Sequence, residues 1–301
     1  MSVLFLLALS LPCVALASGG DRAALQAAGI ERVCTDADLA GREALPTPGT
    51  TPRPGLASPT RAPWIVANGW RFTRRPAAKY VYDVPAGKAA LAAAEAFAYG
   101  ADTILKIDPA DVQPLGEMLR FLRALPPDNP MVPSVNLPIV SDFGIVDDGS
   151  PMTGEVMNLL ARRNLLFEIV PEATPRFPIT IKIGSPEYPR EEAADPSAFA
   201  IKIRRQLTDE RRSLRVYGSE IVICRLMGDM GSARIHLINY SGREIQGLRI
   251  RVRGAYGRGA VHVAGAGRLD LDDQASDGNF TEFTVPRLTT YAVVDLSRSR
   301  L

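Results

Sequence analysis

One stretch, residues 143–170, limits the fold more than any other. An apolar run ending at Asp147 and Asp148 is followed by a turn, an amphipathic segment from Pro151 to Arg163 and a second apolar run, Leu165 to Val170. This order predicts a strand–helix–strand unit whose two strands lie parallel. The two aspartates would then follow the carboxyl end of a strand, at the sheet edge where ligands bind in open α/β proteins.

The segments upstream of this unit repeat the alternation of strand and helix. An alanine-rich run, residues 87–99, consists of strong helix formers and stops at Gly100, a suitable carboxyl-terminal cap. Short apolar runs at 79–83 and 103–107 flank it and predict two strands, and a further helix should open at Pro114. Alternating strands and helices imply a parallel sheet.

Carboxylates should gather along one rim of this sheet. Asp83 and Asp108 each end a predicted strand, on the same rim that Asp147 and Asp148 would occupy. Two carboxyl groups suffice for glycoside cleavage, one as the acid and the other as the base or nucleophile. The alternative is that Asp147 and Asp148 cap the helix that follows them or point to water.

Past residue 171 the pattern moves from helices to short strands. A strand is expected at 179–183, a helix from Pro196 and a last strand of the α/β region at 214–217. From Gly218 onward, about six or seven short runs with a period of two and glycine-rich turns predict an antiparallel β-sandwich of about 80 residues. The fold class is therefore α/β followed by all-β.

The amino-terminal residues have the pattern of an export signal. Residues 1–17 carry no charge, contain a short apolar run and end in a small-x-small pattern before Ser18. The apolar run is too short to span a membrane, so we expect removal after Ala17 and a secreted or periplasmic protein with no membrane segment. Residues 18–63 are irregular and proline-rich, residues 64–217 form the α/β region and residues 218–301 form the sandwich.

Two cysteines, Cys34 and Cys224, would remain after this cleavage. They are candidates for a disulfide in an oxidising compartment. They lie far apart in the sequence, however, and Cys224 falls within an apolar run where a free cysteine packs as a small core residue. Packing in the core is the preferred interpretation for Cys224.

Aromatic and hydrogen-bonding side chains gather just after the proline-rich segment. Flat aromatic faces beside a few polar groups are typical of a sugar-binding cleft, and the alternative is that the rings anchor the core at a strand end. The candidate saccharide-binding residues are Trp64, Asn68, Trp70, Arg71, Tyr80 and Tyr82.

Composition and missing motifs exclude several functions. A formal charge of +2 on 301 residues gives no field that would gather nucleic acid or anionic lipid. The two histidines, His236 and His262, both fall in the sandwich, so the α/β region has no imidazole for a Ser-His or Cys-His relay. Phosphate-loop, dinucleotide-binding and zinc-ligand spacings are absent from the sequence as well, and we expect no cofactor and no metal.

The layout resembles the back half of a known enzyme class. Residues 94–106, Phe143-Gly-Ile-Val-Asp-Asp148 and residues 233–241 are similar in order and texture to multidomain bacterial β-galactosidase-like glycosidases, in which a TIM barrel is followed by a glutamine-amidotransferase-like domain and a small β-sandwich. The resemblance implies a carbohydrate context and a non-catalytic middle domain that mediates subunit contact. In that family the catalytic glutamates belong to the barrel, and neither can be matched to a position here.

Three hypotheses follow from the sequence. The first is a secreted, carbohydrate-associated, glycosidase-like protein, catalytic or degenerate, that takes a saccharide through its aromatic and acidic groups. The second is a non-catalytic interaction module that self-associates through an amidotransferase-like domain. The third is another hydrolase or transferase with carboxylate chemistry.

Overall fold

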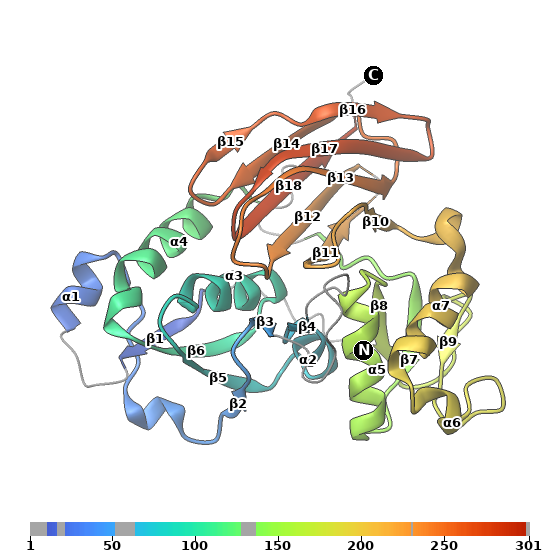
Figure 1. The fold of residues 1–301 in the computed structure, drawn as a ribbon, viewed down its shortest axis with the longest axis horizontal. Coiled ribbons are helices and arrows are strands. Elements are labelled where there is room, and N and C mark those ends of the chain that lie inside the picture. The colour runs from blue at the N-terminus through green and yellow to red at the C-terminus, as the bar shows by residue number, and fades with distance from the viewer. Residues whose placement is uncertain (1–10, 17–21, 52–63, 128–136, 230, 299–301) are drawn as a thin grey trace, which may run out of the picture.

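The chain folds into three packed parts. The computed structural model describes residues 11–16, 22–51, 64–127, 137–229 and 231–298. A four-stranded sheet with its helices lies beside a smaller strand–helix unit, and a two-sheet sandwich covers both (Figure 1). The predicted class, α/β followed by all-β, is confirmed. Among the described helices, none is long and apolar enough to cross a membrane.

The first sheet is parallel throughout, in the order β1-β6-β5-β2. Its strands are β1 (Cys13–Leu16), β2 (Glu43–Leu45), β5 (Lys79–Val84) and β6 (Asp102–Ile107). The helices of this part are α1 (Arg22–Ala27), η1 (Asp36–Leu39), α2 (Gly69–Arg74), α3 (Ala89–Tyr99), η2 (Pro109–Asp111) and α4 (Val112–Ala124). A separate antiparallel pair is formed by β3 (Gly49–Thr51) and β4 (Trp64–Val66).

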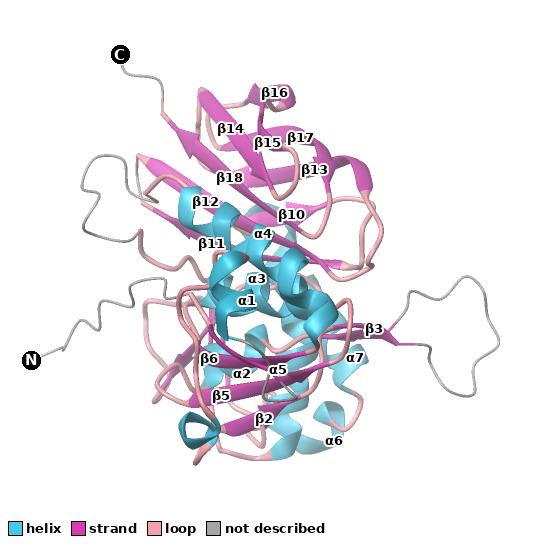
Figure 2. Cartoon of the chain, turned by 90° about the vertical axis from the view of Figure 1, so that its left-hand side faces the viewer, coloured by secondary structure: helices cyan, strands magenta, loops and turns pink. Residues whose placement is uncertain are grey.

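Helix α3 is the centre of the main core. It lies between the first sheet and the sandwich, as the view turned by 90° shows (Figure 2). Its buried alanines allow close packing there. The helix ends as predicted at Gly100, which adopts a left-handed φ of 63° and donates its amide to the Phe97 carbonyl at 3.0 Å. Leu115, Leu119 and Leu122 of α4 are buried, as their helical spacing predicts.

Regular structure extends into both amino-terminal segments. Strands β2 and β3 lie within the proline-rich segment that was expected to be irregular, because β5 and β4 supply partners for their backbone groups. Residues 13–16, inside the expected export signal, form β1, and Val14 is fully buried. Residues 1–10, Ala17 and residues 52–63 lie outside the described residues, and cleavage after Ala17 stays a prediction.

The second part is the strand–helix–strand unit that the sequence marks most clearly. Its parallel sheet has the order β8-β7-β9, from β7 (Phe143–Val146), β8 (Phe167–Val170) and β9 (Thr180–Ile181). Its helices are α5 (Pro151–Arg162), α6 (Arg190–Ala193) and α7 (Pro196–Arg211). Asp147 and Asp148 follow β7 as predicted. Their sheet is separate from that of Asp83 and Asp108, so the expected common rim is wrong.

The third part is the predicted antiparallel sandwich, with sheets β10-β13-β17-β16 and β11-β12-β18-β14-β15. Its strands are β10 (Leu214–Val216), β11 (Val222–Gly228), β12 (Ser232–Asn239), β13 (Ile245–Arg253), β14 (Arg258–Val263), β15 (Gly267–Leu269), β16 (Asp272–Ser276), β17 (Phe280–Leu288) and β18 (Tyr291–Ser297). Strand β10, expected to close the α/β region, pairs antiparallel with β13 and so belongs to the sandwich.

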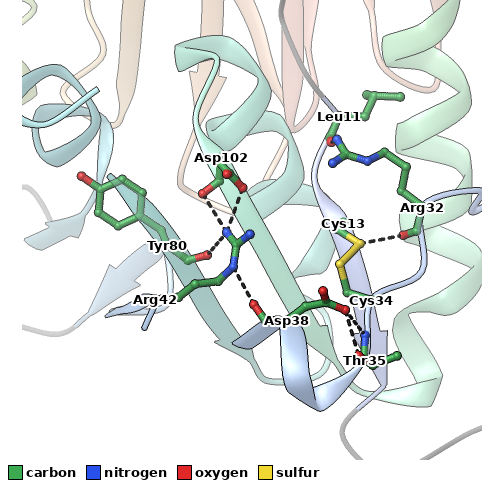
Figure 3. The surroundings of a disulfide bond; sticks show 9 residues. All are labelled: Leu11, Cys13, Arg32, Cys34, Thr35, Asp38, Arg42, Tyr80 and Asp102. Atoms are coloured by element: carbon green, nitrogen blue, oxygen red, sulfur yellow. Dashed lines mark hydrogen bonds and ion pairs between the residues drawn. A yellow bond between two sulfur atoms is a disulfide. The ribbon is translucent and has the colours of Figure 1, made fainter. Parts of the chain in front are cut away.

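The disulfide joins different cysteines from the pair considered in the sequence. Cys13 of β1 is bonded to Cys34, just before η1, and the two Cα atoms are 5.9 Å apart (Figure 3). Cys224 is free and buried in the sandwich core, as its apolar surroundings predict. A pair between Cys34 and Cys224 is therefore wrong.

Candidate functional site

A cavity of about 390 Å³ lies where the three parts of the molecule meet. We call it the junction cavity. Helix α2, the end of α3, residues 139–141, strand β8 and strand β11 all contribute to its walls, which are mainly apolar and aromatic. The lining residues used below are Trp70, Arg74, Tyr99, Ile139, Glu168 and Arg225. An apolar cavity with a few polar groups is the usual form of a small-molecule site.

Close contact between α2 and α5 sets the position of two wall residues. A Cβ atom added at Gly154 of α5 would lie 2.6 Å from an Arg74 guanidinium nitrogen and 3.1 Å from Cζ3 of Trp70. Only a glycine therefore lets Trp70 and Arg74 approach this turn of α5. Arg74 donates from Nε and Nη2 to the two carboxylate oxygens of Asp147 at 2.8 and 2.7 Å, a bidentate pair that fixes the guanidinium plane.

Two further charged groups stand in the cavity wall. Arg225 of β11 donates to the Ala98 carbonyl at 2.6 Å, and its guanidinium lies 5.1 Å from the centre of the Tyr99 ring. Burial lowers the pKa of Arg225. Glu168 of β8 forms an ion pair with Arg176. The cavity therefore offers guanidinium donors and a carboxylate around an apolar interior.

Ile139 marks the accessible side of the junction cavity. Its side chain is 51% exposed, the largest exposure of any large hydrophobic residue in the part of the chain that the structure describes. Its backbone forms an isolated antiparallel bridge with Met227. The side chain can therefore be changed without removing a core contact.

The predicted saccharide-binding residues do not gather in one cleft. Asn68, Tyr80 and Tyr82 are fully buried within the main core, which agrees with the core-anchor alternative. Of the whole predicted set, Trp70 alone lines the junction cavity, and it is 9% exposed.

An arginine side chain covers part of each tryptophan ring. The half-buried Arg71 lies with its guanidinium 4.2 Å from the Trp70 ring centre. Trp64 is half-buried, and the Arg162 guanidinium lies 4.0 Å from its ring centre. A sugar could therefore stack on neither ring without competing with an arginine.

The structure also reveals an acid that the sequence analysis missed. Glu95 of α3 is fully buried and accepts four hydrogen bonds: from the Asn68 amide at 2.6 Å, the Asn68 side chain at 3.2 Å, the Tyr240 hydroxyl at 2.6 Å and the Tyr82 hydroxyl. Burial raises the pKa of Glu95, and these donors act in the opposite direction. Glu95 has no exposed surface, and its bond to Tyr240 joins α3 to the sandwich.

The two aspartates after β7 are held in their ionised form. The hydrogen bond from Arg74 is the main cause that lowers the pKa of Asp147. Partial burial raises the pKa of Asp148, but hydrogen bonds from Thr153 and Ser150 outweigh it and lower the pKa to about 2. Neither carboxylate can serve as a general acid near neutral pH, and the capping alternative describes Asp148 well.

The other carboxylates of the expected rim do not form a catalytic pair with these two. Asp108 caps η2 by accepting the Ala110 amide at 2.8 Å, and Asp83 is exposed at the end of β5. Burial raises the pKa of Asp142, whose Oδ1 accepts the Ser213 amide at 3.0 Å. Within the described ranges, no three His, Cys, Asp or Glu side chains are grouped closely enough to hold a metal ion.

Replacing Asp148 with alanine should lower the free energy of unfolding by about 1 kcal/mol, because α5 loses the acceptor for Ser150 and Thr153. The pKa of Asp148 is lower in the folded than in the unfolded state, so its contribution is present above the ordinary value of 3.8 and lost as the pH falls toward 2. Urea unfolding at pH 7 and pH 2.5 should show the two proteins converging at low pH. The same difference in unfolding free energy between wild type and Asp148→Ala at both pH values would contradict a lowered pKa for Asp148. Asp83→Ala serves as the exposed control.

Comparison with known proteins places the chain by fold alone. No protein-family model and no curated protein matches the sequence. Among solved structures, α-L-fucosidase isoenzyme 2 from Paenibacillus thiaminolyticus is similar, with a TM-score of 0.55 and 9% identity over 77% of this chain and 62% of the fucosidase. A β-galactosidase from Rahnella sp. R3 has a TM-score of 0.43, with 10% identity over 76% of this chain and 56% of that chain. A GH42 β-galactosidase from G. stearothermophilus has a TM-score of 0.42, with 10% identity over 95% of this chain and 59% of that chain.

The chain thus spans about three fifths of the length of these enzymes. Its structural neighbours are glycoside hydrolases, and the glycosidase-like layout expected from the sequence is confirmed at the level of fold.

Proposed function

We propose that this protein is a glycosidase-like module that binds a saccharide in the junction cavity without cleaving it. The observation that carries the proposal is the cavity itself, whose apolar and aromatic walls enclose about 390 Å³ and include two guanidinium groups. Such a volume lies in the range of about 300–1,000 Å³ that small-molecule sites occupy. Sugar C–H faces would contact Ile139 and the other apolar walls, and sugar hydroxyls would accept hydrogen bonds from Arg74 and Arg225.

Binding rather than cleavage follows from the state of the carboxylates. Glycoside hydrolysis needs one carboxyl group that carries a proton near neutral pH beside a second that does not. Asp147 and Asp148 have lowered pKa values, and their oxygens already accept hydrogen bonds. Glu95 and Asp142 have raised pKa values but are buried in structural contacts. Among the residues that the structure describes, no carboxylate pair around the cavity has the properties of an acid and a base.

We also propose that the protein functions in an oxidising compartment, secreted or periplasmic. The disulfide between Cys13 and Cys34 supports this, because such bonds persist outside reducing cytosol. The self-association expected from the sequence stays a prediction.

Saccharide binding can be tested by isothermal calorimetry and thermal unfolding with a panel of neutral sugars. L-Fucose is the first probe, because the fucosidase shares the fold. We expect saturable binding that raises the melting temperature. Ile139→Asp should weaken binding by about tenfold or more, since it places a charge at the apolar lip of the cavity.

Ile201→Asp is the matched control for this experiment. Ile201 is the other exposed large hydrophobic residue among those that the structure describes, at 37%, and it lies on α7 outside the cavity. Its replacement should leave sugar affinity unchanged. The proposal fails if no sugar of the panel binds, or if both variants lose affinity equally.

A further inference from the structure

A second cavity, of about 450 Å³, has the opposite chemical character to the first. It lies between the end of α5, helix α7, strand β10 and the turn at residues 217–220. Five of its lining residues are arginines: Arg162, Arg163, Arg204, Arg212 and Arg215. Glu220 is the one acidic side chain among the described residues that line it. We call this the arginine cavity.

The positive charges of the arginine cavity are only partly neutralised. Arg215 pairs with Asp209 at 2.6 Å, and Arg212 shares the same carboxylate at 3.5 Å. Glu220 is exposed. Arg204 has no ion pair or hydrogen bond with any described residue, and its charge helps to lower the pKa of Arg212, after burial. Three of the arginines, Arg204, Arg212 and Arg215, therefore have one carboxylate, that of Asp209, among them, which leaves a concentrated positive field in a concave site.

Arg212 makes this arrangement more than a solvated surface. It is only 6% exposed, and its Nε has no hydrogen-bond partner within the described residues. Its other nitrogens make long contacts, each 3.5 Å, to Asp209 and to the Arg163 carbonyl. A buried guanidinium whose donors are poorly satisfied is unfavourable unless another acceptor approaches.

We propose that the arginine cavity binds a tetrahedral oxyanion of the phosphate or sulfate class, either free or as an ester on a small molecule. Planar guanidinium forks match the oxygens of such groups in paired hydrogen bonds, and several forks around one cavity favour a group with three or four acceptor oxygens over a single carboxylate. The Ser197 and Ser219 hydroxyls in the same wall can supply further donors. This site shares one lining residue, Asn164, with the junction cavity but is otherwise lined by different residues, and the inference does not depend on sugar binding there.

The test uses the full chain at constant ionic strength, because added salt would otherwise screen the field and obscure the result. Inorganic phosphate, sulfate, glucose 6-phosphate and glucose 6-sulfate are titrated by calorimetry and thermal unfolding, with chloride as the simple monovalent anion and glucose as the uncharged sugar for comparison. We expect saturable binding of the oxyanions and none of chloride. A free ion that binds as well as its ester identifies the ion as the ligand, whereas an ester that binds at least tenfold more tightly identifies the sugar ester.

Two adjacent arginines on α7 provide matched variants. Arg204→Ala should weaken oxyanion binding by about tenfold or more, since it removes a charged donor from the cavity. Arg205→Ala removes the same charge from an exposed position that does not line the cavity, and should leave affinity unchanged. Ile139→Asp should leave oxyanion affinity unchanged too, so a loss of oxyanion binding can be told apart from a loss of sugar binding at the junction cavity. The proposal would be overturned if Arg204→Ala and Arg205→Ala lost the same amount of oxyanion affinity, or if no oxyanion bound saturably.

Discussion

Replacing Glu95 with alanine is expected to lower the free energy of unfolding by about 3–5 kcal/mol, the range for breaking a buried polar network by removing one charged partner. Glu95 is the common acceptor for the Tyr82 hydroxyl, the Tyr240 hydroxyl and two groups of Asn68. Without it, buried donors from β5, from the start of α2 and from the end of β12 lose their partner. Urea unfolding at neutral pH measures the loss directly.

Glu168, which is only half-buried, is the control for this experiment. Its ion pair with Arg176 lies at the surface, so Glu168→Ala should change the free energy of unfolding by about 1 kcal/mol or less. A small effect for Glu95→Ala, similar to that of Glu168→Ala, would contradict the network. Tyr240→Phe and Tyr82→Phe then measure the two hydroxyls separately, and their double variant should show coupling because both donate to one carboxyl group.

The pH dependence of the Glu95 effect has a definite sign. Burial is the largest cause of the shift and raises the pKa of Glu95 above its ordinary value of 4.5. A raised pKa in the folded state means that the acid stabilises the fold fully below about pH 4.5, and that this stabilisation is lost as the pH rises through the folded-state pKa. Glu95→Gln cannot ionise, so the stability of the wild-type protein relative to this variant should fall between pH 4 and pH 8. A constant difference over that range would show that Glu95 does not change its ionisation there.

Local patterns in the sequence predict local structure well. The strand–helix–strand unit at 143–170 and the alanine-rich helix ending at Gly100 form as expected, because helix periodicity and capping are encoded within a few residues. Strand pairing is encoded less directly. The three-residue strand Leu214–Val216 contains no sign of whether it joins the α/β region or the sandwich, and its partner β13 decides that.

The candidate site was only partly predictable for the same reason. Trp70 was found from its aromatic neighbours, and Arg74, one helical turn later on the same face of α2, could have been found from its spacing. Glu95 resembles a solvent-facing residue in an alanine-rich helix. Its partners Tyr82 and Tyr240 lie 13 and 145 positions away, so only the folded chain brings them together. The five arginines of the second cavity come from α5, α7, the residue that follows each of these helices, and β10, and show no motif in the sequence.

Removing the disulfide by Cys34→Ser is expected to lower the free energy of unfolding by about 2–4 kcal/mol, because the bond closes a loop that the unfolded chain would otherwise leave open. The bonded cysteines are 21 positions apart. They hold β1 at the edge of the first sheet, where backbone hydrogen bonds of 2.9 Å link Val14 to Arg32 and to Cys34. A reducing agent should lower the melting temperature of the wild-type protein but leave that of Cys34→Ser unchanged.

The same bond decides between two accounts of the amino terminus. Cleavage after Ala17, as the sequence predicts, would remove Cys13 and the buried strand β1, expose the edge of β6 and leave Cys34 unpaired. The burial of Val14 and the disulfide lead us to expect that the purified protein keeps Cys13. Intact mass before and after reduction, with peptide mapping of the purified protein, checks this expectation. A chain that begins at Ser18 and shows no response to reductant would contradict it. That result would support cleavage after Ala17, and the first sheet would then lack β1.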